Sequence, residues 1–522
     1  MNREEMLARI ADAGQKWDFI VIGGGATGVG VALEAASRGY RVALLEQNDF
    51  ASGTSSRSTK LIHGGVRYLQ QGNVSLVLEA LKERGILRRN APHLVHDLPF
   101  IVPTYDWWEG PFYGIGLKLY DMLAGKEGFG PSEILSKEET LEKIPTVETD
   151  GLRGGVIYHD GQFDDSRLVV NLVQTAAEQG GTLINYFEAV KLIKKNGLVG
   201  GVIARDLEAR DLESGREYEL KSRAVINATG VFSDRIRRMD DPGMLPFMRP
   251  SQGVHIVLDR SFLPGETAIM VPHTDDGRVL FAIPWHHRVL VGTTDTPVED
   301  VSMEPLPMDH EIEFLLKHTA RYLTKDPEPG DVLSMFAGLR PLVSGKQHFE
   351  TARISREHTL SISRTGLVTI AGGKWTTYRK MAQETVDQGI VVARLNHRPS
   401  VSETLQIHGY HHHADQFENL KDYGTDALEI QRLIKNKPAW GAPLPGGSIV
   451  RGEVIWAVKA EMARTVEDFL ARRRRVLFLD ARAAIKMAPA VAELMAAELK
   501  KGIHWQKKQI ESFQKTAHNY LL

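Results

Sequence analysis

One stretch of the sequence, KLIHGGVRYLQQG at residues 60–72, gathers side chains that could bind anions and move protons. A lysine, a histidine, two glycines, an arginine and a tyrosine fall within nine positions, and neither a helical nor a strand repeat explains the pattern. Histidine titrates near neutral pH, so His63 is suited to proton transfer. Arg67 offers a planar, permanently charged set of donors, which suits an anionic ligand. The pattern raises the question of which ligand these side chains serve.

A glycine-rich turn shortly before this stretch predicts a dinucleotide site. The segment WDFIVIGGGATGVGVALEAASRGYRVALLEQ is typical of a strand, a helix and a second strand, at residues 19–22, about 26–38 and 41–46. Gly23 permits the tight turn, Gly25 lets a pyrophosphate approach the helix N-terminus, and Gly28 lets the helix pack on the strand. Glu46 ends the second strand, where a carboxylate accepts hydrogen bonds from ribose hydroxyls.

Two later glycine turns favour FAD over a nicotinamide dinucleotide. VINATGVFSD (225–234) reads as a strand that ends at Gly230 and turns into a helix, and TIAGGKWTTYRKMAQETV (369–386) reads as a strand, a double glycine and a helix. FAD is longer than one crevice and must be held from several distant segments. A helix N-terminus beside Gly373 suits the flavin N1 and C2 carbonyl, which gain negative charge on reduction.

Composition limits the remaining chemistry. The chain has 522 residues, a formal net charge of −2 and no cysteine. Disulfides, thiolate nucleophiles, Cys-ligated metals and cysteinyl attachment of a flavin are therefore excluded, and no overall positive field favours nucleic acid. The sequence has no apolar run of about 18 residues and no apolar secretion signal near its start, so we expect a cytoplasmic protein.

The pattern of elements predicts an α/β FAD-binding Rossmann-like domain, an interleaved mixed β-sheet substrate domain and an all-α C-terminal domain. Strand-like runs and turns dominate the middle of the chain, and helical spacing of apolar residues follows after about residue 396. We assign 16–75, 150–240 and 335–396 to the FAD-binding part. The substrate part covers 76–149 and 241–334, and the helical part covers 397–522.

Several of these motifs together resemble the FAD-dependent glycerol-3-phosphate dehydrogenases of the glycine/D-amino-acid-oxidase-like superfamily. They are VIGGGATGVG, SSRSTKLIHGGVRYLQ, INATGVFSD, IPWHHRVLVGTTD, FAGLRPL, RISREHTL and AGGKWTTYRKMA. The likeness runs from about residue 16 into the C-terminal helices. The chain departs from the family pattern at Trp375 and in the loop after the fingerprint, which is richer in arginine and serine than expected.

The resemblance implies oxidation of sn-glycerol 3-phosphate to dihydroxyacetone phosphate, with electrons passed to a membrane quinone. A phosphate monoester carries about two negative charges near neutral pH, so its site needs arginine-type donors. The candidate substrate residues are Arg67, Tyr68, Arg340 and Arg356. Arg340 stands between Leu339 and Pro341 at the end of an apolar run, where a charge should be paired or functional.

The C2 hydroxyl proton needs a base, and His255, His63 and Lys374 are the candidates. His255 lies in the apolar strand QGVHIVLD, where we expect a neutral imidazole. The family-like motifs imply non-covalent FAD, held by Gly23, Gly25, Gly28, Glu46, Ser55, Ser56, Gly64, Gly65, Thr229, Gly230, Gly338, Gly373 and Thr376. We further expect a homodimer attached peripherally to the inner face of the cell membrane.

Three other features invite functional readings. The triplet HHH at 411–413 lacks a second ligand cluster, so we expect no metal site. The run RRRR at 472–475 must point to several helix faces, so we expect solvated or salt-bridged arginines. The aromatic segment WWEGPFYGIGLKLYDMLAG at 107–125 fits either buried packing or a membrane interface, and we favour burial of its tryptophans.

Alternative functions remain open at this point. A related FAD-dependent amine or amino-acid oxidase would need one carboxylate anchor and an apolar cage for the amine, rather than several arginines. A glycerol-3-phosphate oxidase would use the same substrate with oxygen as acceptor. A flavin-binding scaffold without activity would keep Glu46 and the fingerprint glycines but would lose members of the arginine and histidine set.

Overall fold

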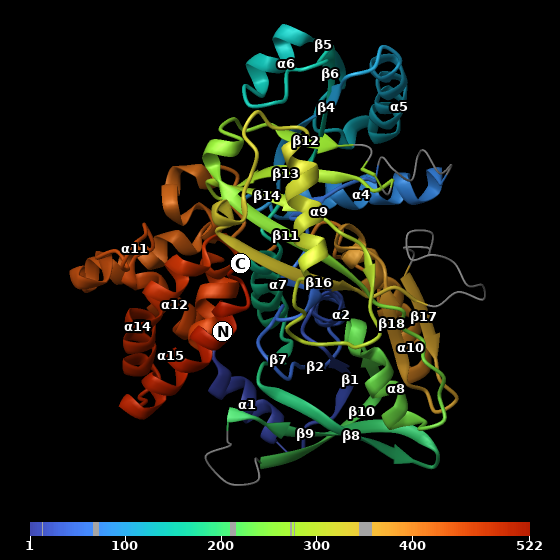
Figure 1. Ribbon diagram of the computed structural model, residues 1–522. Coiled ribbons are helices and arrows are strands. Elements are labelled where there is room, and N and C mark those ends of the chain that lie inside the picture. Colours follow the sequence, from blue (N-terminus) through green and yellow to red (C-terminus); the bar gives the residue numbers. More distant parts are fainter. Residues whose placement is uncertain (13, 66–72, 209–215, 272–273, 276, 344–357) are drawn as a thin grey trace.

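The structure is a computed structural model of residues 1–522, and it describes all of them except 13, 66–72, 209–215, 272–273, 276 and 344–357. Two large sheets lie one above the other in Figure 1, and the C-terminal helices pack along one side of both. The fold class therefore agrees with the expectation from sequence.

The first sheet carries the dinucleotide fingerprint. Its order is β17-β18-β10-β1-β2-β7, and β1 lies between β10 and β2, parallel to both. Strand β1 is apolar except for Asp18 and buried along its whole length, as expected for a central parallel strand with helices on both faces. The strands are β1 (Trp17–Ile22), β2 (Val42–Leu45), β7 (Thr182–Ile184), β8 (Phe187–Lys195), β9 (Leu198–Asp206), β10 (Arg216–Asn227), β17 (His358–Ile362) and β18 (Val368–Gly372).

The second sheet is mixed, because β12 pairs parallel to β4 whereas its other pairs are antiparallel. The order is β15-β11-β14-β13-β12-β4-β6-β3, with β16 added on β11 and β5 on β6. The strands are β3 (Leu61–Ile62), β4 (His96–Thr104), β5 (Glu133–Ser136), β6 (Gly154–Gln162), β11 (Ser251–Asp259), β12 (Ala268–Val271), β13 (Leu280–Trp285), β14 (Arg288–Gly292), β15 (Thr296–Pro297) and β16 (Ser334–Arg340).

Three strands differ from the domain division expected from sequence. Strands β3, β6 and β16 fall in the ranges expected for the FAD-binding part, but all three pair in the second sheet. Strand β16 pairs with β11 from Ser251–Arg340 to Val257–Ser334, so long-range pairing decides its place. The two strands that carry His255 and Arg340 are therefore direct neighbours.

The helices cover the sheets and build the C-terminal part. Those before residue 397 are α1 (Arg3–Ala11), α2 (Ala26–Ser37), α4 (Val74–Asn90), α5 (Glu109–Ala124), α6 (Lys137–Lys143), α7 (Asp165–Glu178), α8 (Ser233–Asp240), α9 (Asp309–Ala320) and α10 (Tyr378–Ala393). The C-terminal ones are α11 (Asp426–Asn436), α12 (Arg451–Ala460), α13 (Val476–Leu479), α14 (Ala481–Glu498) and α15 (Ile503–His518). The last group docks on β16, where Ser334 Oγ donates to Leu477 O at 2.8 Å and Met335 N donates to Tyr520 O at 3.0 Å.

Helix α5 exposes an unusual number of apolar side chains at one extremity of the molecule (Figure 1). Trp107 is 78% exposed and Trp108 is 41% exposed, so the expectation that these tryptophans are buried is wrong. The helix repeat places its polar anchor, Tyr120, on the opposite side, where it is 1% exposed. We call the exposed set the α5 apolar face: Trp107, Trp108, Phe112, Ile115, Leu119 and Met122.

Candidate functional site

The glycine turn between β1 and α2 has the form expected of a phosphate-binding turn. Gly23 has φ 110°, a value that favours glycine, and a Cβ there would lie 2.6 Å from Ala228 O. A Cβ on Gly28 would overlap Gly23 O, so that glycine is needed for close packing of α2. Gly25 caps α2 without a side chain over its first turn, and Ser55 Oγ accepts a hydrogen bond from Ala26 N at 2.9 Å. The N-terminus of α2 therefore borders the adjoining cavity without a large side chain in front of it.

Glu46 follows β2 beside this turn. Its Oε2 accepts from Gly24 N at 2.6 Å and its Oε1 accepts from Asn48 N at 2.8 Å. Burial raises the pKa of this carboxyl to about 7, although both backbone donors favour the charged form. A ribose hydroxyl that donated to Glu46 would stabilise the carboxylate further.

One cavity of about 350 Å³ joins the turn to the second sheet. Its walls come from the first sheet, from β11 and β16, and from the residues after β18. Thirteen of the residues predicted from sequence line it: Gly23, Gly25, Glu46, Ser55, His63, Thr229, Gly230, His255, Gly338, Arg340, Gly373, Lys374 and Thr376. Segments far apart in the chain thus meet in one cavity, as expected for a dinucleotide that is held from several segments.

Other predicted residues lie elsewhere. Gly64 faces helices instead of the cavity, since a Cβ there would come within 2.5 Å of Leu81 Cδ2 and would overlap Tyr120 Oη. Ser56 is 1% exposed, and its hydroxyl donates to Gly53 O at 3.4 Å. Gly28 and Gly65 are likewise outside the lining. The predicted residues Arg67, Tyr68 and Arg356 lie outside the described part of the chain.

His255 lies on β11 at the back of the cavity and is 2% exposed. Its ring stacks on Phe336 with centroids 4.9 Å apart, and its Nε2 is 3.0 Å from Thr59 Oγ1. Gly292 on the neighbouring strand leaves room for the ring, because a Cβ there would overlap His255 Cδ2. Burial holds the pKa of His255 well below its ordinary value, and the charges of Lys60 and Arg340 add to the effect. The imidazole is therefore neutral near pH 7, in the form that accepts a proton.

Arg340 ends β16 with its guanidinium held in a fixed orientation. Nη1 donates to Asp295 Oδ1 at 3.0 Å and to Gln252 O at 3.1 Å, and Nη2 donates to Thr294 O at 2.8 Å. The side chain is 21% exposed and lines the cavity. The sequence-based expectation of a paired charge at this position is confirmed, and the guanidinium is oriented before any ligand binds.

Lys60 belongs to the segment 60–72, and the sequence alone assigned it no role. It is fully buried, and its Nζ donates to Asp165 Oδ2 at 2.7 Å and to Ser56 O at 2.9 Å. Arg475 approaches the same carboxylate, with Nη2 3.2 Å from Asp165 Oδ1. Burial lowers the pKa of Lys60 to about 7, although Asp165 opposes that shift. This pair fixes residues 56–60, a segment that includes Thr59, the hydrogen-bond partner of His255.

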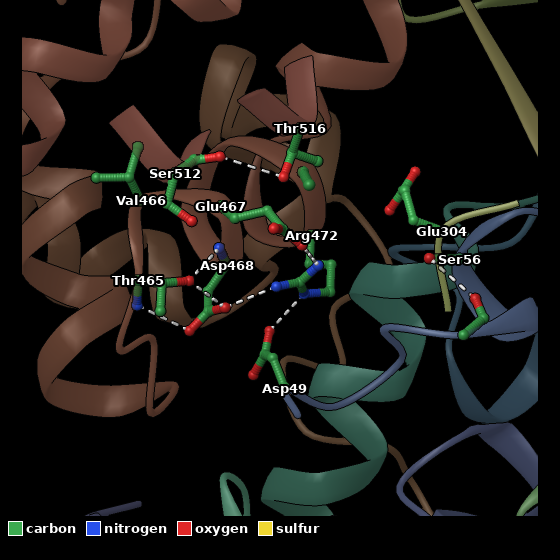
Figure 2. A network of polar contacts seen from close by, with 12 residues as sticks. Asp49, Ser56, Glu304, Thr465, Val466, Glu467, Asp468, Arg472, Ser512 and Thr516 are labelled. Carbon is green, nitrogen blue, oxygen red and sulfur yellow. Dashed lines mark hydrogen bonds and ion pairs between the residues drawn. The ribbon is translucent and has the colours of Figure 1, made fainter. Parts of the chain in front are cut away.

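Three arginines of the run 472–475 are buried rather than solvated: Arg472, Arg473 and Arg475. Arg473 donates to both oxygens of Asp49, at 2.6 and 3.0 Å, and both side chains are fully buried. Arg472 lies between Asp49 and Asp468, at 2.7 and 2.6 Å (Figure 2). Salt bridging was among the sequence-based expectations, but burial was not. The run joins the C-terminal helices to the loop that follows Glu46.

Comparisons with known proteins place these features in a family. The family described as FAD dependent oxidoreductase (DAO) matches residues 18–379, and the C-terminal domain of alpha-glycerophosphate oxidase matches residues 363–510. A Mus musculus protein named glycerol-3-phosphate dehydrogenase, mitochondrial, is 40% identical over 551 aligned residues, which cover 100% of this chain and 75% of the relative. The Caenorhabditis elegans protein named probable glycerol-3-phosphate dehydrogenase, mitochondrial, is 41% identical and covers 98% of this chain and 74% of the relative.

A solved structure agrees with these matches. The glycerol-3-phosphate dehydrogenase from Bacillus halodurans, solved in complex with FAD, superposes with a TM-score of 0.81 at 27% identity. The alignment covers 100% of this chain and 98% of that one.

Proposed function

The chain belongs to the FAD-dependent glycerol-3-phosphate dehydrogenases, and from this premise we propose that it oxidises sn-glycerol 3-phosphate to dihydroxyacetone phosphate and passes the electrons to a quinone. The observation that carries the proposal is the shared cavity, which places His255 and Arg340 in the same space as the α2 phosphate turn. Residues predicted from sequence to bind the cofactor therefore line the same cavity as residues predicted to act on the substrate.

The cavity fits FAD by its own geometry. Gly25 leaves the first turn of α2 uncovered, and a Cβ there would lie 3.0 Å from Ser55 Oγ. Glu46 supplies a carboxylate at the end of β2, and Thr229, Gly230, Gly373 and Thr376 supply backbone and hydroxyl groups from two further turns. When bound, FAD supplies the acceptor for the hydride that leaves C2 of the substrate.

We assign the base to His255. A neutral imidazole with its Nε2 turned toward Thr59 on the cavity wall can accept the C2 hydroxyl proton. Thr59 orients the ring before substrate arrives, and the stack on Phe336 restricts its rotation. His63 and Lys374 line the same cavity and remain the alternative bases.

We assign phosphate recognition to Arg340, together with Arg67, Tyr68 and Arg356. Of this set, the structure describes Arg340. Its ion pair with Asp295 orients the guanidinium but occupies only part of its five N–H donors. The other three stay predictions from the family-like motifs.

We propose further that the protein reaches its quinone at the inner face of the cell membrane through the α5 apolar face. Within the described residues, no helix is both long and apolar enough to cross a bilayer. Trp107 and Ile115 are 78% and 74% exposed, as suits insertion into a lipid interface. The opposite side of α5 holds the cavity wall, because Tyr120 Oη accepts from Gly64 N, next to His63, at 3.0 Å. The homodimer stays a prediction.

The membrane assignment is tested with vesicles that contain anionic lipid. Replacing Trp107, Phe112 and Ile115 with serine should abolish cosedimentation and leave oxidation with a soluble dye unchanged. The matched control is Leu245→Ser, since Leu245 is 82% exposed in another part of the molecule. Equal vesicle binding by the triple variant and wild type would contradict the assignment.

The reaction is tested by product analysis. Glycerol 3-phosphate and a quinone analogue should give dihydroxyacetone phosphate, with little hydrogen peroxide in air. A second candidate, an oxidase that uses oxygen, draws on the match of residues 363–510 to the C-terminal domain of alpha-glycerophosphate oxidase. Stoichiometric peroxide would favour it.

A further inference from the structure

Arg57 is a buried cation on the cavity wall to which the proposed reaction gives no role. It lies in the arginine- and serine-rich loop after the fingerprint and is 6% exposed. Its Nη1 and Nη2 donate to Glu304 Oε1 at 3.1 Å and to Glu304 Oε2 at 2.7 Å. Nη1 also donates to Ala337 O at 3.3 Å, which fixes the guanidinium on β16.

The Arg57–Glu304 pair joins two chain segments that both line the cavity. Arg57 comes from the connection between β2 and β3, beside the turn that holds Ser55. Glu304 comes from the connection between β15 and α9, whose residues Ser302, Met303 and Pro305 line the cavity. That connection is irregular backbone, so side-chain contacts must help to hold it in place.

The C-terminal helices support the pair from behind. The guanidinium carbon of Arg57 lies 5.8 Å from the ring centroid of Phe478 and 6.0 Å from that of Tyr520. Tyr520 is 2% exposed and interacts with both Arg57 and Glu304. In Figure 2, Glu304 lies on the same side of the view as Ser56 and apart from Asp49. Ser56 directly precedes Arg57 in the sequence.

We propose that Arg57 is a positioning residue, which clasps Glu304 to hold segment 302–305 over the cavity and thereby controls entry of substrate and of small electron acceptors. Arg57 also neutralises a carboxylate at a site that must admit a phosphate dianion. The inference rests on the proposed function in that it takes the cavity as the flavin and substrate site.

The test uses FAD-loaded enzyme in anaerobic rapid mixing with glycerol 3-phosphate. Arg57→Met leaves the Glu304 carboxylate without a neutralising cation, so the half-saturation concentration for the anionic substrate should rise about tenfold. The limiting rate of flavin reduction should stay within about twofold, because no group that touches substrate has changed. In the double variant Arg57→Met/Glu304→Gln the carboxylate is also gone, so part of the affinity should return.

A second readout does not depend on the substrate. Dithionite-reduced Arg57→Met and the double variant should both react with oxygen several times faster than wild type, because the segment is no longer clasped. The control is Glu83→Gln, which removes the negative charge from a two-bond pair with Arg379, at 2.6 and 2.8 Å; this pair is more buried than the Arg57–Glu304 pair and lies outside the cavity lining. It should leave both readouts unchanged.

The outcomes separate the two proposals. If wild type is not reduced by glycerol 3-phosphate, the proposed function fails while the oxygen reaction still tests the clasp. Unchanged half-saturation and oxygen rates in both Arg57 variants, or the same changes in Glu83→Gln, would overturn the clasp. If Arg57→Met does not retain FAD, Tyr520→Phe takes its place, and it should show the same changes at smaller size.

Discussion

Replacing Arg340 with alanine should impair oxidation of glycerol 3-phosphate far more than oxidation of glycerol. The guanidinium is held by Asp295 and by two backbone carbonyls, so it is positioned for a phosphate without further ordering. Loss of a buried charged contact costs about 2 to 5 kcal/mol, which corresponds to about a 30- to 5,000-fold fall in kcat/KM. Glycerol lacks the phosphate and should lose only the part of this effect that comes from local disorder.

The structure also supplies a control for that local effect. Asp295 is 11% exposed and would keep its hydrogen bond from Ser251 but lose its cation, so the single substitution also leaves a largely buried carboxylate without a neutralising charge. The double variant Arg340→Ala/Asp295→Asn removes that carboxylate. If Arg340 binds phosphate, the double variant stays as slow with glycerol 3-phosphate as the single one.

Steady-state kinetics with both substrates and a soluble dye acceptor measure the effect. Arg340→Lys should fall between wild type and alanine, since it keeps the charge and loses the planar fork. Equal loss for glycerol and glycerol 3-phosphate, or full recovery in the double variant, would show that Arg340 is structural.

Three further predictions concern the base, the cofactor and the acid range. His255→Ala should slow flavin reduction by about 10²- to 10⁴-fold with little change in substrate binding, as read from flavin spectral shifts; near-wild-type reduction would move the role to His63 and then to Lys374. Acid precipitation should release the flavin into solution, since the fingerprint turn with Glu46 and the turns at Gly230 and Gly373 can hold FAD without a covalent bond, and a yellow pellet would contradict non-covalent binding. Burial lowers the pKa of His93 to about 3, so the folded protein takes up its proton later than the unfolded chain. His93 should therefore contribute a fall in the free energy of unfolding of about 1.4 kcal/mol per pH unit between about pH 6.5 and about pH 3. His93→Gln should reduce the measured slope by that amount in denaturant titrations, and an unchanged slope would refute the burial argument.

The parts of the site that depend on local sequence were predictable. Short motifs record the positions where backbone conformation or close packing requires a particular residue. Such positions include the turn at Gly23–Gly28, Glu46, Gly230 and Gly373. The place of His255 and Arg340 on the cavity wall was also predictable, because a polar residue in an apolar strand needs a partner or a ligand.

The parts that depend on long-range pairing were not predictable. Strand β16 joins the second sheet through its register with β11, which one sequence does not record. Gly64 looked like a cofactor contact, but Tyr120 on a helix far along the chain occupies the space beside it. Asp49 and Arg473 are 424 positions apart, so their buried pair left no local signal. The exposure of Trp107 was not predictable either, because an aromatic segment in the sequence is compatible with both a buried and an exposed position.

The most direct test of the central claim is an anaerobic titration of the oxidised, FAD-loaded protein with glycerol 3-phosphate. We expect that the visible flavin absorbance bleaches and that one dihydroxyacetone phosphate forms per FAD reduced. Glycerol should bleach it only at far higher concentration. A flavin that stays oxidised with glycerol 3-phosphate but bleaches with an amine or amino acid would contradict the account.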